Sequence, residues 1–154
     1  MLPTMFTAYG DSEKIFKKDS RITFDKFLVN TDDSFDLEEG IFKANKGGYY
    51  AFSFFAIQVN PKHESFPNDF ARIQVLVDRK PILKFLNYEH SKKTGPLQSL
   101  NGLDTISFAF NLKLNKGQHV ELFVERGQIK CDDDANCVFN GRFVRPLRFK
   151  YDDK

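Results

Sequence analysis

Hydrophobic residues recur at every second position along most of this chain, which is the period of a β-strand with one buried face. Tyr50, Phe52, Phe54 and Ala56 show the pattern most clearly. No window holds a sustained helical period. The alternation predicts strands around these residues and in the segments 5–9, 22–28, 73–77, 106–114 and 120–124.

In two of these segments the alternation also predicts which residues share a face. In the first strand we expect Met5, Thr7 and Tyr9 to point to one side. In the next segment, the alternating positions are Ile22, Phe24, Lys26 and Leu28.

Clusters of Gly, Pro, Asn and Asp separate the predicted strands, as at 45–48 and 115–117, and such clusters are typical of turns. Many short strands joined by turns predict an all-β sandwich or barrel, and no linker or repeat divides 1–154 into more than one domain. Two polar stretches, 63–68 and 89–101, are predicted to be long loops. Such loops either bind ligands or are solvated connections.

The composition agrees with a β-rich domain and raises a question about assembly. The 154 residues are the usual length of one domain, and they include 18 Phe and no Trp. Aromatic residues favour strands. So many phenylalanines either fill one monomer core or supply an additional buried interface between copies of the chain.

Charge and motifs exclude several classes of function. The 23 basic and 21 acidic residues are interleaved and leave a formal charge of +2, which disfavours nucleic-acid binding. No apolar run reaches the length of a membrane span, and residues 1–9 are too short and polar for a signal peptide. His63, His90 and His119 lie in separate segments without metal-ligand spacing, and no nucleophile or phosphate-binding motif occurs. We therefore expect no enzyme and no membrane insertion.

One spaced set of residues resembles a known family. Its members are Phe24, Asn30, Phe35, Phe42 and the run Gly48-Tyr49-Tyr50-Ala51-Phe52-Ser53-Phe54. This set resembles the signature of the C1q globular-head domain, which is related in fold to tumour necrosis factor. The segments 6–9, 112–122 and 139–143 also look like strands of that family.

The resemblance implies a secreted, ten-stranded jelly-roll sandwich that assembles as a homotrimer. The matched residues are expected to be structural: Gly48 suits a position that requires a positive φ or a close approach of the backbone, and every second aromatic residue after it points into the core. The expected core residues are Phe24, Phe35, Phe42, Gly48, Tyr50, Phe52, Phe54 and Gly141.

Cys131 and Cys137 are the two cysteines, and they bracket an acidic turn. Paired, they would close a loop of about seven residues, worth about 2 kcal/mol, and would imply an oxidising compartment. Free thiols or a zinc site are the alternatives, and zinc is disfavoured because no histidine lies nearby.

Calcium is a candidate ligand at two places. Asp132, Asp134 and Asn136 alternate like the first ligands of an EF-hand, but Cys137 and Phe143 stand where that loop requires Gly and Glu, so an EF-hand is excluded. An open calcium site or a solvated acidic turn remains.

The family resemblance offers the second calcium candidate, because some of its members hold calcium through aspartates that precede a long strand. Asp104 falls on such a position, and Glu89 is a candidate second ligand.

Arg142, Arg145, Arg148 and Lys150 form a basic cluster near the C-terminus. Such a cluster either binds sulfated or sialylated glycans or lies on a solvated edge strand; His90, in a predicted loop, is a further ligand candidate. We expect a trimeric recognition domain that binds glycan or protein ligands, as in innate-immune pattern recognition. The alternative is a signalling ligand or a trimerisation module of a longer extracellular protein.

Overall fold

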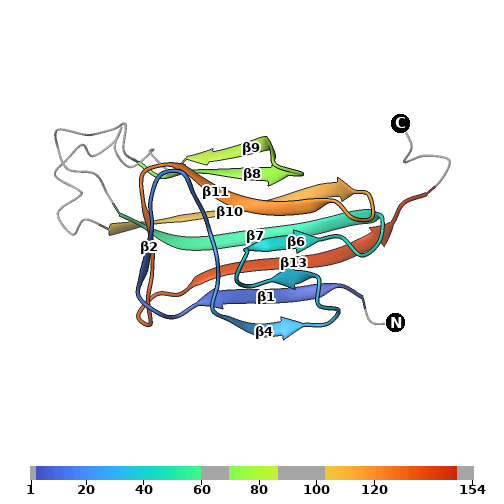
Figure 1. The fold of residues 1–154 in the computed structure, drawn as a ribbon, viewed down its shortest axis with the longest axis horizontal. Coiled ribbons are helices and arrows are strands. Elements are labelled where there is room, and N and C mark those ends of the chain that lie inside the picture. Colours follow the sequence, from blue (N-terminus) through green and yellow to red (C-terminus); the bar gives the residue numbers. More distant parts are fainter. Residues whose placement is uncertain (1–2, 60–69, 87–102, 149–154) are drawn as a thin grey trace.

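The computed structural model describes residues 3–59, 70–86 and 103–148, and these residues form thirteen strands and no helix. The strands build two antiparallel sheets that stack as a sandwich (Figure 1). In this part of the chain no helix could span a membrane. The predicted all-β sandwich is therefore confirmed.

The first sheet has seven strands and is organised around β7 (Gly48–Val59). Along one edge, β7 pairs with β10 over twelve residues; along the other it pairs with β13 and then, near its end, with β12. β1 pairs with β13 and β4, and β2 pairs with β12. The bounds are β1 Met5–Gly10, β2 Lys14–Phe16, β4 Lys26–Asn30, β10 Leu103–Leu114, β12 Ile129–Cys131 and β13 Cys137–Pro146.

The second sheet has six strands in the order β5-β6-β11-β8-β9, with β3 paired to β11. The bounds are β3 Ser20–Arg21, β5 Phe35–Asp36, β6 Ile41–Lys43, β8 Arg72–Val77, β9 Lys80–Leu86 and β11 His119–Arg126. The described strands outnumber the expected ten because β2, β3, β5, β6 and β12 are separate strands of two or three residues.

The space between the sheets is filled largely by aromatic rings. Phe139 lies at the centre of this cluster and is fully buried. The six aromatic residues expected in the core are all buried, namely Phe24, Phe35, Phe42, Tyr50, Phe52 and Phe54. Apart from Phe55 and Phe123, every phenylalanine in the described residues is buried or packed against the core. One monomer core therefore accounts for nearly all of these rings, and their number does not by itself indicate an interface.

The two glycines expected in the core lie where the backbone approaches its neighbours closely. A Cβ atom on Gly141 would lie 2.7 Å from Cζ of Phe6, and one on Gly48 would lie 2.6 Å from the carbonyl oxygen of Arg145. Both distances are too short for a carbon atom. A close approach, rather than a positive φ at Gly48, is therefore what requires these glycines.

In two segments the alternating positions singled out from the sequence do not form the buried face. In β1 the buried residues are Phe6 and Ala8, and Met5 is 42% exposed. In the second segment Ile22 is buried but Leu28 is 72% exposed, because β4 is an edge strand with an irregular register against β1. In β1 both alternating sets contain apolar residues, so the period alone did not identify the buried face.

Candidate functional site

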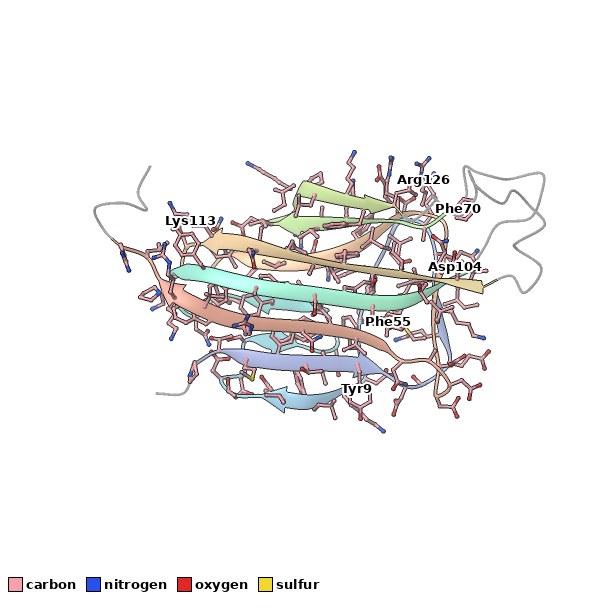
Figure 2. The ribbon with its side chains drawn as sticks, turned by 180° about the vertical axis from the view of Figure 1, so that it is seen from behind. Tyr9, Phe55, Phe70, Asp104, Lys113 and Arg126 are labelled. Carbon is pink, nitrogen blue, oxygen red and sulfur yellow. A yellow bond between two sulfur atoms is a disulfide. The ribbon has the colours of Figure 1, made fainter. Side chains whose placement is uncertain are left out.

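The outward face of the seven-stranded sheet is the surface on which two of the predicted binding residues, Arg142 and Arg145, meet. In β7 the even-numbered residues from Tyr50 to Gln58 are buried, so the odd-numbered ones point outward. Residues paired across antiparallel strands point to the same side. The outward face therefore consists of rows that cross the strands, and Figure 2 shows Phe55 and Tyr9 toward one end of the strands and Lys113 toward the other.

The middle row, which contains Thr7, Asn140 and Ser53, consists of small polar side chains. Thr7 Oγ1 donates a hydrogen bond of 2.6 Å to Asn140 Oδ1, and Asn140 Nδ2 donates one of 3.0 Å to Ser53 Oγ. These bonds tie β1, β13 and β7 together on their outer side. Ala51 and Ala109 border the same row, and their short side chains leave a shallow hollow of about 500 Å³.

Exposed apolar side chains occur at both ends of this sheet, and one row of them lies toward the end where β7 finishes. Phe55, 36% exposed, is in register with Val138 of β13, which is in turn in register with Tyr9 of β1. Among the described residues, seven large hydrophobic side chains are exposed, and six of them belong to this sheet. The six are Met5, Ile15, Leu28, Val29, Phe55 and Val144.

Cations gather at the opposite end of the face. Lys113 of β10 is in register with Tyr49 of β7, which is in register with Arg145 of β13. The Arg145 guanidinium lies over the Tyr49 ring, 4.3 Å from its centroid. In the neighbouring row, Arg142 is in register with Ala51 and is exposed.

The structure thus brings two of the predicted arginines together and adds a lysine that sequence reasoning missed. Arg148 lies beyond the end of β13 and is exposed. The sequence did not single out Lys113, because its neighbours on the face belong to strands that are far away in the sequence. The one available signal was its outward position in the strand 106–114.

The acidic turn is closed by a disulfide between Cys131 and Cys137, whose Cα atoms are 5.1 Å apart and whose side chains are buried. Asp132 Oδ1 accepts hydrogen bonds from the backbone N–H groups of Asp134 and Ala135, at 3.0 and 2.9 Å. Lys130 Nζ lies 3.2 Å from the other carboxylate oxygen of Asp132. The Ala135 N–H and Lys130 together lower the pKa of this carboxyl group.

These contacts bear on the predicted calcium ligands. The carboxylates of Asp132, Asp133 and Asp134 approach one another within 4.8 Å, but both oxygens of Asp132 already have partners within the turn. Calcium takes six to eight oxygen ligands. A calcium ion here would have to displace Lys130, so the turn fits the ion poorly.

Asp104 is placed at the start of β10, in register with the buried Gln58 (Figure 2). Its Oδ1 atom accepts a hydrogen bond of 2.8 Å from the N–H of Thr105. Its candidate partner Glu89, the ligand candidate His90 and the two predicted long loops lie outside the described residues. Calcium at Asp104 and Glu89 therefore stays a prediction.

Solved structures with the same fold are found among complement and tumour necrosis factor proteins. The globular domain of the zebrafish complement 1qA protein matches with a TM-score of 0.68 and 17% identity, covering 94% of this chain and 99% of that one. Eiger TNF from S. frugiperda matches with a TM-score of 0.65 and 10% identity, covering 94% and 96%. Murine APRIL at pH 5.0 matches with a TM-score of 0.62 and 8% identity, covering 91% and 99%.

Comparison with curated protein sequences finds no match. The model of the C1q domain family, however, matches residues 5–144, which include every strand of the first sheet except the last two residues of β13. The chain belongs to the C1q domain family.

Proposed function

We propose that this chain is the non-enzymatic recognition domain of an extracellular protein, and that it works as a homotrimer formed through the outward face of the seven-stranded sheet. C1q domains are in general non-enzymatic and typically extracellular, which supports the first part. The observation that carries the second part is the concentration of six of the seven exposed large hydrophobic side chains, counted over the described residues, in that one sheet.

Burial of this face gives a physical reason for assembly. Removing apolar surface from water contributes about 25 cal/mol per Å², and a stable interface buries about 800 Å² on each partner. Phe55, Met5 and Val144 are 36%, 42% and 50% exposed in the single chain, so each has surface left to bury. The small residues Ala51, Ser53 and Ala109 leave room for a second copy to approach.

Assembly also determines where ligands bind. Three copies held together present their loops as one multivalent surface, which raises avidity by about 10²–10⁴ without any new contact. The disulfide-closed turn 131–137 lies at the end of the sandwich opposite the cationic residues (Figure 1). A closed, hydrogen-bonded turn loses little entropy on binding, so we place glycan or protein recognition at that end.

The decisive experiment compares two matched Phe→Lys variants by light scattering coupled to size exclusion. Phe55→Lys puts a charge on the proposed interface, whereas Phe123→Lys puts one on β11 of the other sheet, where Phe123 is also partly exposed. We expect the wild type and Phe123→Lys near three times 17.9 kDa and Phe55→Lys near 17.9 kDa, all with β-type circular dichroism. A monomeric wild type, or a trimeric Phe55→Lys variant, contradicts the proposal.

The ligand class is tested on the assembled protein. Reproducible signals on a glycan array that disappear with the monomeric variant support multivalent glycan recognition. Activation of a cell-surface receptor without glycan binding supports the signalling alternative.

A further inference from the structure

Two cations on the outward face of the seven-stranded sheet have no partner among the described residues. Lys113 and Arg142 are both exposed, and neither makes an ion pair or a side-chain hydrogen bond within the described part of the chain. Lys26, an exposed cation of β4 in the same sheet, is by contrast paired with Asp11 at 2.8 Å. Arg145, beside them, is already held over the Tyr49 ring and so is not counted with these two cations.

Within the described residues, the strands around them offer no acid to neutralise these charges. The seven strands of the sheet contain a single acidic residue, Asp104. Asp104 is in register with the core-facing Gln58 and sits at the far end of β10 from Lys113. In the described residues, an acidic hollow of about 350 Å³ lined by Asp33, Asp36 and Glu39 involves the other sheet.

The two side chains are close enough to act together. Lys113 and Arg142 lie on strands separated only by β7, in adjacent outward rows. A strand spacing of about 4.8 Å and a rise of about 3.4 Å per residue put their Cα atoms roughly 12 Å apart. Between them lie Asn111 and the small Ala51, both of which line the same hollow as Arg142.

In a cyclic trimer the positions of these two cations in one copy determine where the cations of all three copies meet. In a closed ring the same residues of every copy lie at the same height along the axis. If the outward face forms the interface, as proposed above, the cations of three copies converge at one end of it. Like charges repel more strongly there than in bulk water, because burial lowers the dielectric.

We propose that a tetrahedral oxyanion, sulfate or phosphate, binds between the copies at Lys113 and Arg142 and stabilises the trimer. This inference rests on the proposed homotrimer. Arginine binds such an anion through paired N–H donors and lysine through a point charge, and both interactions are charge-assisted. The Asn111 amide on the rim of the hollow supplies a further donor.

The test uses the intact chain and follows thermal unfolding and solution mass in sodium sulfate and in sodium chloride at equal ionic strength. We expect sulfate, and likewise inorganic phosphate, to raise the Tm of the wild type by about 3–6 °C at ten times its Kd with one anion bound per copy. The double variant Lys113→Gln/Arg142→Gln should stay trimeric, lose this response, and be no less stable than the wild type in chloride. Lys17→Gln/Lys18→Gln, which removes two exposed charges outside this sheet, should keep the response.

A third arm replaces inorganic sulfate by a heparin-derived tetrasaccharide. A response to the tetrasaccharide at micromolar concentration, abolished by Lys113→Gln/Arg142→Gln, assigns the bound sulfate to a glycan; a response to the free anions alone assigns it to the free ion.

The failures are distinguishable. A monomeric wild type overturns the proposed homotrimer and this inference with it. A trimer with no specific response to sulfate or phosphate overturns the inference alone. A double variant that is less stable than the wild type in chloride also overturns it, because the cations would then pair with acids of a neighbouring copy, such as Asp33 or Asp36.

Discussion

Replacing Phe139 by alanine tests whether the ring cluster between the sheets is a single packed unit. Phe139 is 0% exposed. Its ring centroid lies near those of Phe6 (5.4 Å), Phe24 (6.0 Å), Phe35 (5.7 Å), Phe52 (5.8 Å) and Phe54 (6.4 Å). A buried Phe→Ala change costs about 3–5 kcal/mol through lost burial and the cavity left behind. Since Phe139 is central and its neighbours come from four different parts of the chain, we expect a loss at the upper end, about 4–5 kcal/mol. That is a large share of the 5–15 kcal/mol that typically holds a domain folded.

The measurement is urea unfolding followed by circular dichroism at one protein concentration, since association links stability to concentration. Phe139→Leu, which keeps most of the volume, should lose about 1–1.5 kcal/mol. Phe123→Ala, at a partly exposed position on the outer side of β11, should lose about 1 kcal/mol or less. A loss below about 2 kcal/mol for Phe139→Ala with an unchanged m-value would refute the reasoning, because the cluster would then be able to collapse around the missing ring.

Three further predictions concern the turns. In the β8–β9 hairpin Asp78 and Arg79 have φ of 50° and 68°, so Arg79→Gly should raise the unfolding free energy by about 0.5–1 kcal/mol, as measured by urea unfolding; a loss of stability would show that the Arg79 side chain matters more than its strain. Cys131→Ala/Cys137→Ala should lose about 2 kcal/mol relative to the oxidised wild type, and dithiothreitol should destabilise the wild type but not the variant. Burial would raise the pKa of Asp32, but hydrogen bonds from Ser34, Thr4 and Asn45 outweigh it and lower this pKa. The stabilisation from Asp32 is therefore complete above about pH 4 and is lost as the pH falls through the lowered pKa, so Tm measured from pH 5 to 2.5 should fall less steeply in Asp32→Asn than in the wild type.

The sequence by itself determined the fold class, most strand positions and the family. These features depend on local information: the period of two, the turn residues, and the fixed spacing from Phe24 to Phe54. The burial of Tyr50, Phe52 and Phe54 followed from the same period, because these three successive alternating positions are all aromatic, whereas the other set contains Ala51 and Ser53. In β1 both sets are mixed, and there the period did not identify Phe6 and Ala8 as the buried residues.

Only the tertiary structure decided which distant strands lie side by side. It set β13 between β7 and β1, which made Phe139 the centre of the core and hollowed the outer face over Ala51. It also brought Lys113 of β10 beside the arginines of β13. The physical reason is that strand order and register depend on how whole faces pack against each other. That packing is a sum over contacts between residues far apart in the chain, and no local pattern records it.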